Sequence, residues 1–231
     1  MLILALESSA KPASAAVLAK GELLGQYYQN SGLTHSRTLL AMTESLLINL
    51  DITVNDIGLV AVACGPGSFT GVRIGVSAAK GLAWGREIPI CGVSTLEAMA
   101  CQAPEHGMLI CPVMDARRGQ VYNALFEWRG GKLFRLCEDR AVSLNELADE
   151  LKKNKAPCLL VGDGAELSYE HLSAAGVQCN LAPELLRFQT AYGVALAAAN
   201  VKPIPAIELE PSYLRPSQAE REKAERECRN D

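Results

Sequence analysis

The chain has 231 residues, of which 49% are apolar and 21% are charged. These fractions are typical of soluble globular proteins and exclude a disordered, collagen-like or low-complexity chain. The formal net charge is −4, from 22 basic and 26 acidic residues. The chain therefore lacks the basic excess of a protein that grips a nucleic-acid backbone by itself.

A cytoplasmic location with reduced cysteines is predicted. The longest uncharged run, 57–72, contains one proline and four glycines, which does not fit a membrane-spanning helix. Glu7 interrupts the first apolar run after six residues, and no basic segment precedes it, which does not fit a signal peptide. The eight cysteines include no C-x-x-C pair, and four of them stand in apolar, strand-like runs, which favours buried free thiols.

The first half of the chain predicts a mixed α/β pattern. Leu39, Met42, Leu46 and Leu50 recur at helical spacing behind Thr34, a candidate N-cap. Runs on both sides of a Gly-containing turn predict a hairpin. In chain order the expected elements are a strand at 2–6, a hairpin at 14–19 and 23–29, a helix at 34–50, a buried strand at 57–64, a helix at 72–84, a strand at 88–92, and a helix capped by Ser94 or Thr95.

The same order returns about 108 residues later. Ser143 with Glu146 three residues on is typical of a capping box. The expected elements are a strand at 108–114, a hairpin at 120–128 and 132–137, a helix at 143–153, a strand at 158–161, a turn at 162–164, a helix at 165–175, and a further buried helix at 188–199. The predicted fold is therefore a duplicated α/β architecture with a reduced second lobe.

Three segments are predicted from this repeat. The N-terminal lobe covers 1–103, and the C-terminal lobe covers 104–216. Residues 217–231 are mostly Ala, Glu, Arg and Lys without an apolar stripe. Because their acidic and basic charges nearly cancel, a solvated tail is favoured over a nucleic-acid arm.

The segment Gly65–Gly71 is the sharpest local signal, because it follows a buried strand and opens a helix. Glycines allow positive φ and close backbone approach, and helix N-termini attract anions. No lysine follows the last glycine, so the segment is not a P-loop of the Walker type. Two interpretations stay open: a tight turn that lets the helix pack closely, or a contact with a phosphate or another ligand.

The next helix carries small residues at every fourth position, namely Gly71, Gly75, Ala79 and Ala83. Glycine inside a helix costs about 1 kcal/mol relative to alanine, so another backbone is expected to approach closely. The sequence leaves two candidates open for that neighbour, the helix at 34–50 or another subunit.

Catalytic arrangements are scarce. The three histidines at positions 35, 106 and 171 are far apart, and no helical pair of metal-binding histidines is present. Glu7 and Asp115 end the first strand of each lobe, where they either face a nucleotide-bound Mg²⁺ or cap turns. The turn-capping interpretation is favoured. Gly162-Asp163-Gly164 similarly either contacts an adenosine or turns the chain.

The duplicated pattern resembles the actin/Hsp70/sugar-kinase (ASKHA) architecture, and several motifs resemble the TsaB (YeaZ) family. That similarity runs from residue 1 to about 216. Its motifs are Leu4-Ala5-Leu6-Glu7-Ser8-Ser9, Thr34-His35-Ser36, the eleven residues Gly65 to Gly75, Gly92-Val93-Ser94-Thr95-Leu96, Asp115 to Tyr122, and Glu210-Pro211-Ser212-Tyr213-Leu214-Arg215.

The resemblance implies a non-catalytic relative of TsaD, the subunit that transfers a threonylcarbamoyl group to adenosine 37 of tRNAs that read ANN codons. TsaD holds a metal through H-x-x-x-H, but the second position here is Leu39. ASKHA proteins use D-x-G loops after their first strands, whereas the two loops here read Glu7-Ser8-Ser9 and Asp115-Ala116-Arg117. A scaffold with no catalytic and no metal-binding residue is therefore expected. The alternative is a stand-alone small ATPase or kinase.

The implied partners are TsaD and the ATPase TsaE, with a homodimer when the chain is alone and with tRNA reached only through the complex. No membrane contact is expected. The candidate partner interface comprises Leu39, Met42, Leu46, Gly71, Gly75 and Ala79. No cofactor is expected on the chain alone, but ATP or ADP is expected at the boundary with TsaD. The candidate contacts for that nucleotide or anion are Gly65, Gly67, Ser68, Thr70 and Arg73.

Overall fold

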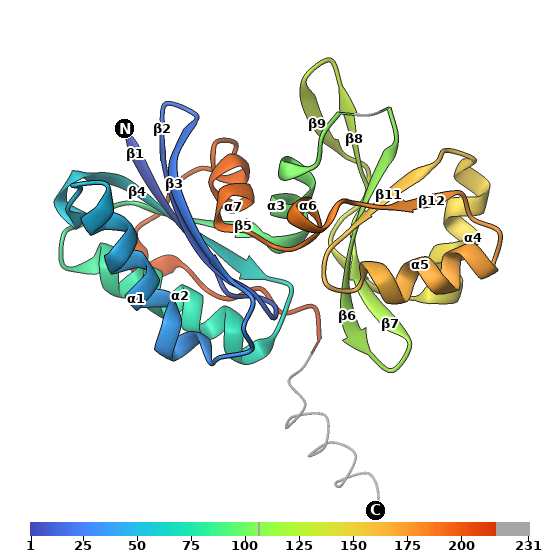
Figure 1. The fold of residues 1–231 in the computed structure, drawn as a ribbon, viewed down its shortest axis with the longest axis horizontal. Coiled ribbons are helices and arrows are strands. Elements are labelled where there is room, and N and C mark those ends of the chain that lie inside the picture. The colour runs from blue at the N-terminus through green and yellow to red at the C-terminus, as the bar shows by residue number, and fades with distance from the viewer. Residues whose placement is uncertain (106, 216–231) are drawn as a thin grey trace, which may run out of the picture.

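The computed structural model describes residues 1–105 and 107–215, which form two α/β lobes side by side (Figure 1). The predicted tail at 217–231 and His106 lie outside the described residues. The first lobe is built on a five-stranded sheet. Its strands, in spatial order, are β3 (Glu22–Gln29), β2 (Ala13–Ala19), β1 (Leu2–Glu7), β4 (Ile57–Gly65) and β5 (Ile90–Ser94).

Helices cover both faces of this first sheet (Figure 1). One face packs against α1 (His35–Asn49) and α2 (Phe69–Trp84), and the other against α3 (Thr95–Gln102) and α7 (Ala191–Ala198). Side chains alternate along a strand, so Leu4 and Leu6 of β1 face α1 and α2 while Ala5 faces α7. Both faces are buried, which explains why β4 is a continuous apolar run.

The second lobe repeats the strand order of the first. Its central strand, β6 (Leu109–Arg117), is antiparallel to β7 (Gln120–Asn123) and parallel to β11 (Cys158–Val161). In the same way β1 is antiparallel to β2 and parallel to β4. The strands, in spatial order, are β10 (Arg140–Ser143), β7 (Gln120–Asn123), β6 (Leu109–Arg117), β11 (Cys158–Val161) and β12 (Cys179–Leu181). The helices α4 (Leu144–Asn154) and α5 (Ala165–Ala174) cover one face. The predicted duplicated α/β fold is confirmed.

Several predicted boundaries are wrong. The helix expected at 72–84 begins at Phe69, because Ser68 caps it by accepting the Gly71 N–H. The predicted hairpin around Gly130 and Gly131 is confirmed as β8 (Phe126–Arg129) paired with β9 (Lys132–Arg135). Its first arm, expected at 120–128, is divided after Asn123, because β7 pairs with β6 and β10 instead. The helix expected at 188–199 is α7, which begins later, at Ala191, and a separate short helix, α6 (Glu184–Arg187), precedes it.

The linker between α6 and α7 is held extended by one partly buried side-chain amide. Gln102 of α3 donates from Nε2 to the carbonyl oxygens of Leu186 and Phe188, at 3.2 and 2.6 Å. Its Oε1 accepts the Thr190 hydroxyl at 2.6 Å, and Thr190 in turn caps α7. Side-chain bonds to the linker carbonyls therefore replace the helical turn that the apolar sequence predicts.

The final described segment returns to the first lobe and ties it to the second. We call residues 204–215 the strap. It includes the short 3₁₀ helix η2 (Ala206–Glu208). Ser212 N donates to Cys64 O at 2.7 Å, and the Arg215 guanidinium donates to Ala116 O of β6 at 2.9 Å. The segments α7 and the strap belong to the second half of the sequence but pack on the first sheet. The predicted division at residue 103 therefore does not coincide with the division between the lobes in space.

No helix in the described ranges combines the length and apolar character needed to cross a membrane. The remaining short element is η1 (Val54–Asp56), which leads into β4.

Candidate ligand pocket between the lobes

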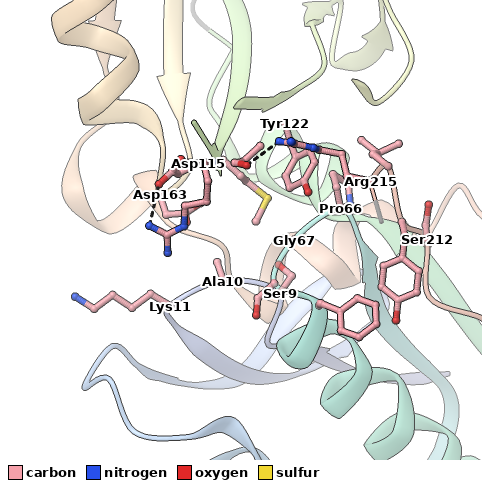
Figure 2. A pocket seen from close by; sticks show the side chains of 17 residues that line it. Ser9, Ala10, Lys11, Pro66, Gly67, Asp115, Tyr122, Asp163, Ser212 and Arg215 are labelled. Atoms are coloured by element: carbon pink, nitrogen blue, oxygen red, sulfur yellow. Dashed lines mark hydrogen bonds and ion pairs between the residues drawn. The ribbon is translucent and has the colours of Figure 1, made fainter. Parts of the chain in front are cut away.

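A pocket of about 470 Å³ opens between the two lobes (Figure 2). Loops after β1 and β4 form one wall, the end of β6 and the loop after β11 form the opposite wall, and the strap forms a third. Figure 2 shows Ser9, Ala10 and Lys11 from the first lobe across from Asp115 and Asp163 of the second. The polar side chains that line it are Ser9, Lys11, Ser68, Asp115, Arg117, Tyr122, Asp163, Ser212, Tyr213 and Arg215.

The acids that end the first strands of the two lobes make the same local contact. Glu7 Oε1 accepts the Ser9 N–H at 2.5 Å, and Asp115 Oδ1 accepts the Arg117 N–H at 2.7 Å. Each carboxylate thus caps the turn after its strand, so both perform the turn-capping role that the sequence favours.

The two acids differ in their surroundings. Asp115 is half-buried and forms an ion pair with Arg117 at 3.3 Å. Glu7 is completely buried, and its Oε2 has no hydrogen-bond partner among the described residues. Burial raises the pKa of Glu7 to about 7, and the charge of Asp163 acts in the same direction.

Asp163, whose charge acts on Glu7, is itself hydrogen-bonded to Gln189. Gln189 is 1% exposed and donates from Nε2 to Asp163 Oδ1 at 2.8 Å. Desolvation raises the pKa of Asp163, and the Gln189 hydrogen bond opposes that shift. The loop Gly162-Asp163-Gly164 therefore turns the chain at the pocket wall, where Asp163 also lines the cavity.

Packing explains the glycines of the loop after β4. Gly65 has a φ of +126°, and a Cβ there would stand 2.2 Å from Ser212 O of the strap. A Cβ on Gly67 would stand 2.4 Å from Ser9 O, and Ser68 N donates to the same oxygen at 2.6 Å. Any larger residue at Gly65 or Gly67 would collide with a neighbouring backbone, which supports the interpretation of this segment as a tight turn. Gly67 and Ser68 also line the pocket, so a ligand contact at these two positions stays a prediction.

The other predicted nucleotide contacts point elsewhere. Thr70 is exposed in the first turn of α2 and is absent from the pocket lining. The Arg73 guanidinium carbon lies 3.7 Å from the ring centroid of Phe69, and its Nε donates to the Tyr213 hydroxyl at 2.8 Å. Phe69 and Tyr213 stack with their centroids 4.8 Å apart. Arg73 therefore holds the strap on α2, and of the five predicted residues Gly67 and Ser68 line this pocket.

Most of the predicted partner interface is inside the molecule. Leu39 is 1% exposed, Leu46 2% and Ala79 0%. Gly71 and Gly75 are also buried, against Ser8, whose Oγ donates to Gly71 O at 2.9 Å. The neighbour of both glycines is therefore the loop after β1, through the Ser8 backbone at Gly71 and the Ser8 side chain at Gly75, and neither candidate that the sequence left open is their neighbour.

Of the six predicted interface residues, only Met42 keeps partial exposure. As placed, the other five cannot touch a partner directly. The outward side of α1 instead presents Leu40, which is 49% exposed, and Ile48, which is 70% exposed. The predicted interface residues Leu39 and Leu46 stand on the inward stripe of this amphipathic helix.

The described histidines have structural roles. His35 Nε2 forms a hydrogen bond with Ala10 O at 2.7 Å, which fixes the pocket loop against the start of α1. His171 Nε2 pairs with Asn145 Oδ1 at 2.8 Å. Within residues 1–105 and 107–215, no group of three or more His, Cys, Asp or Glu side chains has the arrangement of a metal site.

Sequence reasoning missed Lys11 and Gln189, which lie at or beside the pocket. Neither of them belongs to a spacing that predicts chemistry. The strap residue Tyr213 occurs in a motif that the family resemblance singled out, but only the fold shows that it reaches Phe69.

The two lobes repeat one α/β strand order and enclose a pocket, which is the architecture of a duplicated α/β protein. The sequence model of a family described as "TsaD: tRNA N6-adenosine threonylcarbamoyltransferase" matches residues 29–219. The chain is 35% identical over 229 residues to the tRNA threonylcarbamoyladenosine biosynthesis protein TsaB of Bacillus subtilis, which covers 95% of this chain and 96% of that protein. The Escherichia coli protein of the same name is 33% identical and covers 71% of this chain and 72% of its own length.

Solved structures agree with the sequence relatives. YeaZ from Pseudomonas aeruginosa superposes with a TM-score of 0.78 and 25% identity, covering 92% of this chain and 99% of that one. The chain belongs to the TsaB family, as its motifs predicted.

Proposed function

We propose that this chain works in tRNA threonylcarbamoyladenosine biosynthesis as a non-catalytic subunit that activates TsaD. The supporting observation is its similarity to TsaB proteins over 95% of its length. In the proposed complex TsaE joins the pair, and TsaD modifies adenosine 37 of tRNAs that read ANN codons. The chain forms a homodimer when TsaD is absent.

The chemistry of the described residues supports a scaffold. The acids at the two strand ends cap their own turns, and His35 is engaged by the Ala10 carbonyl. The position four residues after His35 is the buried Leu39, which supplies no metal ligand. Burial raises the pKa of the thiols of Cys64, Cys91, Cys101, Cys111, Cys137 and Cys158, which makes them poor nucleophiles.

A nucleotide at the boundary with TsaD belongs to the same proposal. Gly67 and Ser68 stand at the pocket mouth near the start of α2, where backbone N–H groups favour anions. Arg73 contributes indirectly, because its guanidinium contacts Phe69 at the start of α2 and Tyr213 of the strap. Arg73→Ala is therefore expected to weaken nucleotide binding by the complex, and unchanged affinity removes Arg73 from the proposal.

The decisive test is a modification assay on unmodified tRNA with TsaD, TsaE, ATP and a threonylcarbamoyl donor. Modification is expected only when this chain is added, and equal modification without it contradicts the proposal. The competing function, a stand-alone ATPase or kinase, predicts Mg²⁺-dependent ATP turnover by the purified chain. Turnover that is lost in a Glu7→Gln variant of the isolated chain would establish that alternative.

A further inference from the structure

The second lobe gathers four cysteines around one apolar core. Cys111 and Cys158 are buried members of the core that lies under α4 and α5, and Cys137 and Cys179 pack against it. The cysteines of residues 1–105 and 107–215 are all free thiols. The scaffold role proposed above uses none of them.

Two of these cysteines stand side by side on neighbouring strands. In the parallel pair of β11 and β12, Cys158 is in register with Cys179, and Leu160 is in register with Leu181. Side chains in register point to the same face of a sheet, and all four of these pack in or against the core under α4 and α5. Neighbouring strands lie about 4.8 Å apart. That separation falls within the range of about 4.4–6.8 Å between Cα atoms that a disulfide can bridge.

No other two cysteines in the described ranges are in register on neighbouring strands. Cys111 of β6 is level with Leu160, two residues along from Cys158. A rise of about 3.3 Å per residue and the strand spacing place the Cα atoms of Cys111 and Cys158 about 8 Å apart, which is too far for a bridge. In the first lobe, Cys64 and Cys91 pack on opposite faces of the sheet. The strand register therefore selects one pair.

The two thiols of this pair differ in their access to solvent. Cys179 is partly exposed on the edge strand of its sheet, and its sulfur lies 3.5 Å from the Ser173 hydroxyl of α5. Cys158 is 0% exposed, and burial raises the pKa of its thiol to about 12, with Cys179 acting in the same direction. A dissolved oxidant therefore reaches Cys179 first. Cys158 reacts with a group already held beside it, because proximity compensates for its small thiolate fraction.

We propose that Cys158 and Cys179 form a redox-sensitive dithiol, in which hydrogen peroxide oxidises Cys179 and Cys158 then closes a disulfide between β11 and β12. In the first step the Cys179 thiolate attacks one peroxide oxygen and the O–O bond breaks. This leaves a sulfenic acid on Cys179 and a hydroxide, which takes up the proton that the thiol released and becomes water. The proposal does not rest on the role of the chain in tRNA modification.

The second step closes the bridge. The Cys158 sulfur attacks the Cys179 sulfur, the S–O bond breaks, and the hydroxyl group leaves as water with the Cys158 proton. In total, two electrons pass from the two thiols to the peroxide, and a dithiol reductant returns them to the disulfide by thiol–disulfide exchange. Reversible oxidation of this kind is the usual form of a disulfide in a reducing compartment.

The bridge would fasten a short edge strand to its neighbour. Few backbone bonds hold β12, among them one from Cys158 N to Gln178 O at 3.0 Å. The chain that follows β12 reaches the pocket wall, where Arg187 O accepts the Gly162 N–H at 2.6 Å. A disulfide across β11 and β12 closes a loop that contains α5, so oxidation should raise the melting temperature by roughly 5–10 °C.

Peptide mapping of the full chain tests the bridge. The reduced protein is treated with hydrogen peroxide, the remaining thiols are blocked with N-ethylmaleimide in denaturant, and the protein is digested without reduction. Trypsin cuts after Lys155 and Arg187 and so leaves both cysteines on one peptide, which should be unlabelled and lighter by two hydrogen atoms. A second cleavage after Glu166 separates the two cysteines in sequence. The two fragments should then stay joined until dithiothreitol is added.

Serine and alanine variants assign the roles of the two thiols. Cys179→Ser should abolish both the bridge and the rise in melting temperature. Cys158→Ala should leave Cys179 as a sulfenic acid, which dimedone traps. Cys137→Ser is the matched control, because Cys137 is also partly exposed beside the same core but lies outside the strand pair. It should keep the bridge and the rise in melting temperature.

Three outcomes would overturn the proposal. The first is a wild-type chain in which Cys158 and Cys179 both carry maleimide after the peroxide treatment. The second is a bridge from either residue to Cys111 or Cys137. The third is a Cys179 that advances to sulfinic acid while Cys158 stays reduced, which would mean that the strands hold the two sulfur atoms too far apart to join.

Discussion

Gly193 of α7 crosses Ala98 of α3 so closely that a Cβ on Gly193 would stand 2.3 Å from the Ala98 carbonyl oxygen. The obstacle is backbone, which cannot rotate away as a side chain would. Gly193→Ala is therefore expected to push two packed helices apart and to lower the free energy of unfolding by roughly 1–3 kcal/mol. Urea denaturation followed by circular dichroism measures that change.

Gly81 in α2 provides the matched control. A Cβ there meets nothing within 4 Å. Gly81→Ala is thus expected to raise the free energy of unfolding, by up to about 1 kcal/mol, because alanine has the better helix propensity. A similar loss of stability in both variants would show that the crossing at Ala98 is not what makes Gly193 necessary.

Local signals in the sequence predicted the elements that depend on local contacts. Ser143 and Glu146 form the predicted capping box, and Ser94 caps α3 by accepting the Glu97 N–H. The strands β10 and β12 were missed, because each is short and gains its hydrogen bonds only from a distant strand. A distant residue also decides the break before α7, where Gln102 binds the linker carbonyls.

The candidate site was harder to predict because small residues and glycines have several physical uses. Gly71 and Gly75 signalled a close approach correctly, but the neighbour is Ser8, more than sixty positions earlier in the chain. Glu7 and Asp115 were recognised as equivalent strand ends. Nothing in their sequence neighbourhood shows that Glu7 is fully buried while Asp115 is half-buried and has a salt bridge with Arg117.

Glu7→Gln is expected to change how stability depends on pH. The folded pKa of about 7 lies above the ordinary 4.5, so the folded state binds this proton more tightly than the unfolded state does. The stabilising contribution is complete below pH 4.5 and is lost as pH rises to about 7. A shift of that size corresponds to about 3 kcal/mol.

The variant should therefore equal the wild type near pH 4.5 and exceed it in stability at pH 8. Urea denaturation at both pH values provides the comparison. Glu146→Gln is the control, because Glu146 is exposed in the capping box and its pKa is lowered by the Ser143 hydrogen bonds. Equal stability of Glu7→Gln and wild type at pH 8 would mean that Glu7 ionises freely in the folded protein.

The buried thiols should react slowly in the native protein. Burial raises the pKa of Cys64 and Cys91 to about 11, and of Cys101 and Cys158 to about 12. Their thiolate fractions at pH 8 are accordingly well below those of free cysteine. A disulfide-exchange reagent should modify all eight cysteines in denaturant, but these four only after unfolding. Rapid native labelling of Cys91 or Cys158, located by mass spectrometry, would contradict their burial.

The exposed side of α1 is expected to carry the contact with TsaD that the proposed function requires. Leu40 and Ile48 are exposed there, while Leu39 and Leu46 on the inward side pack in the core. Leu40→Glu should leave the melting temperature nearly unchanged, since surface substitutions usually change stability by less than about 0.5 kcal/mol. It should nevertheless abolish co-purification with TsaD and the dependent tRNA modification, because a charge in an apolar contact is left without solvent.

Leu185→Glu is the matched control for this surface. Leu185 is 92% exposed on α6, so the substitution is chemically identical but stands at a different place. It should preserve both TsaD binding and modification. Loss of binding in both variants would point to a general effect of added negative charge, and retention in both would move the interface away from α1. Ala79→Trp is unsuitable for this purpose, because Ala79 is completely buried and its enlargement would disturb the core before it reached a partner.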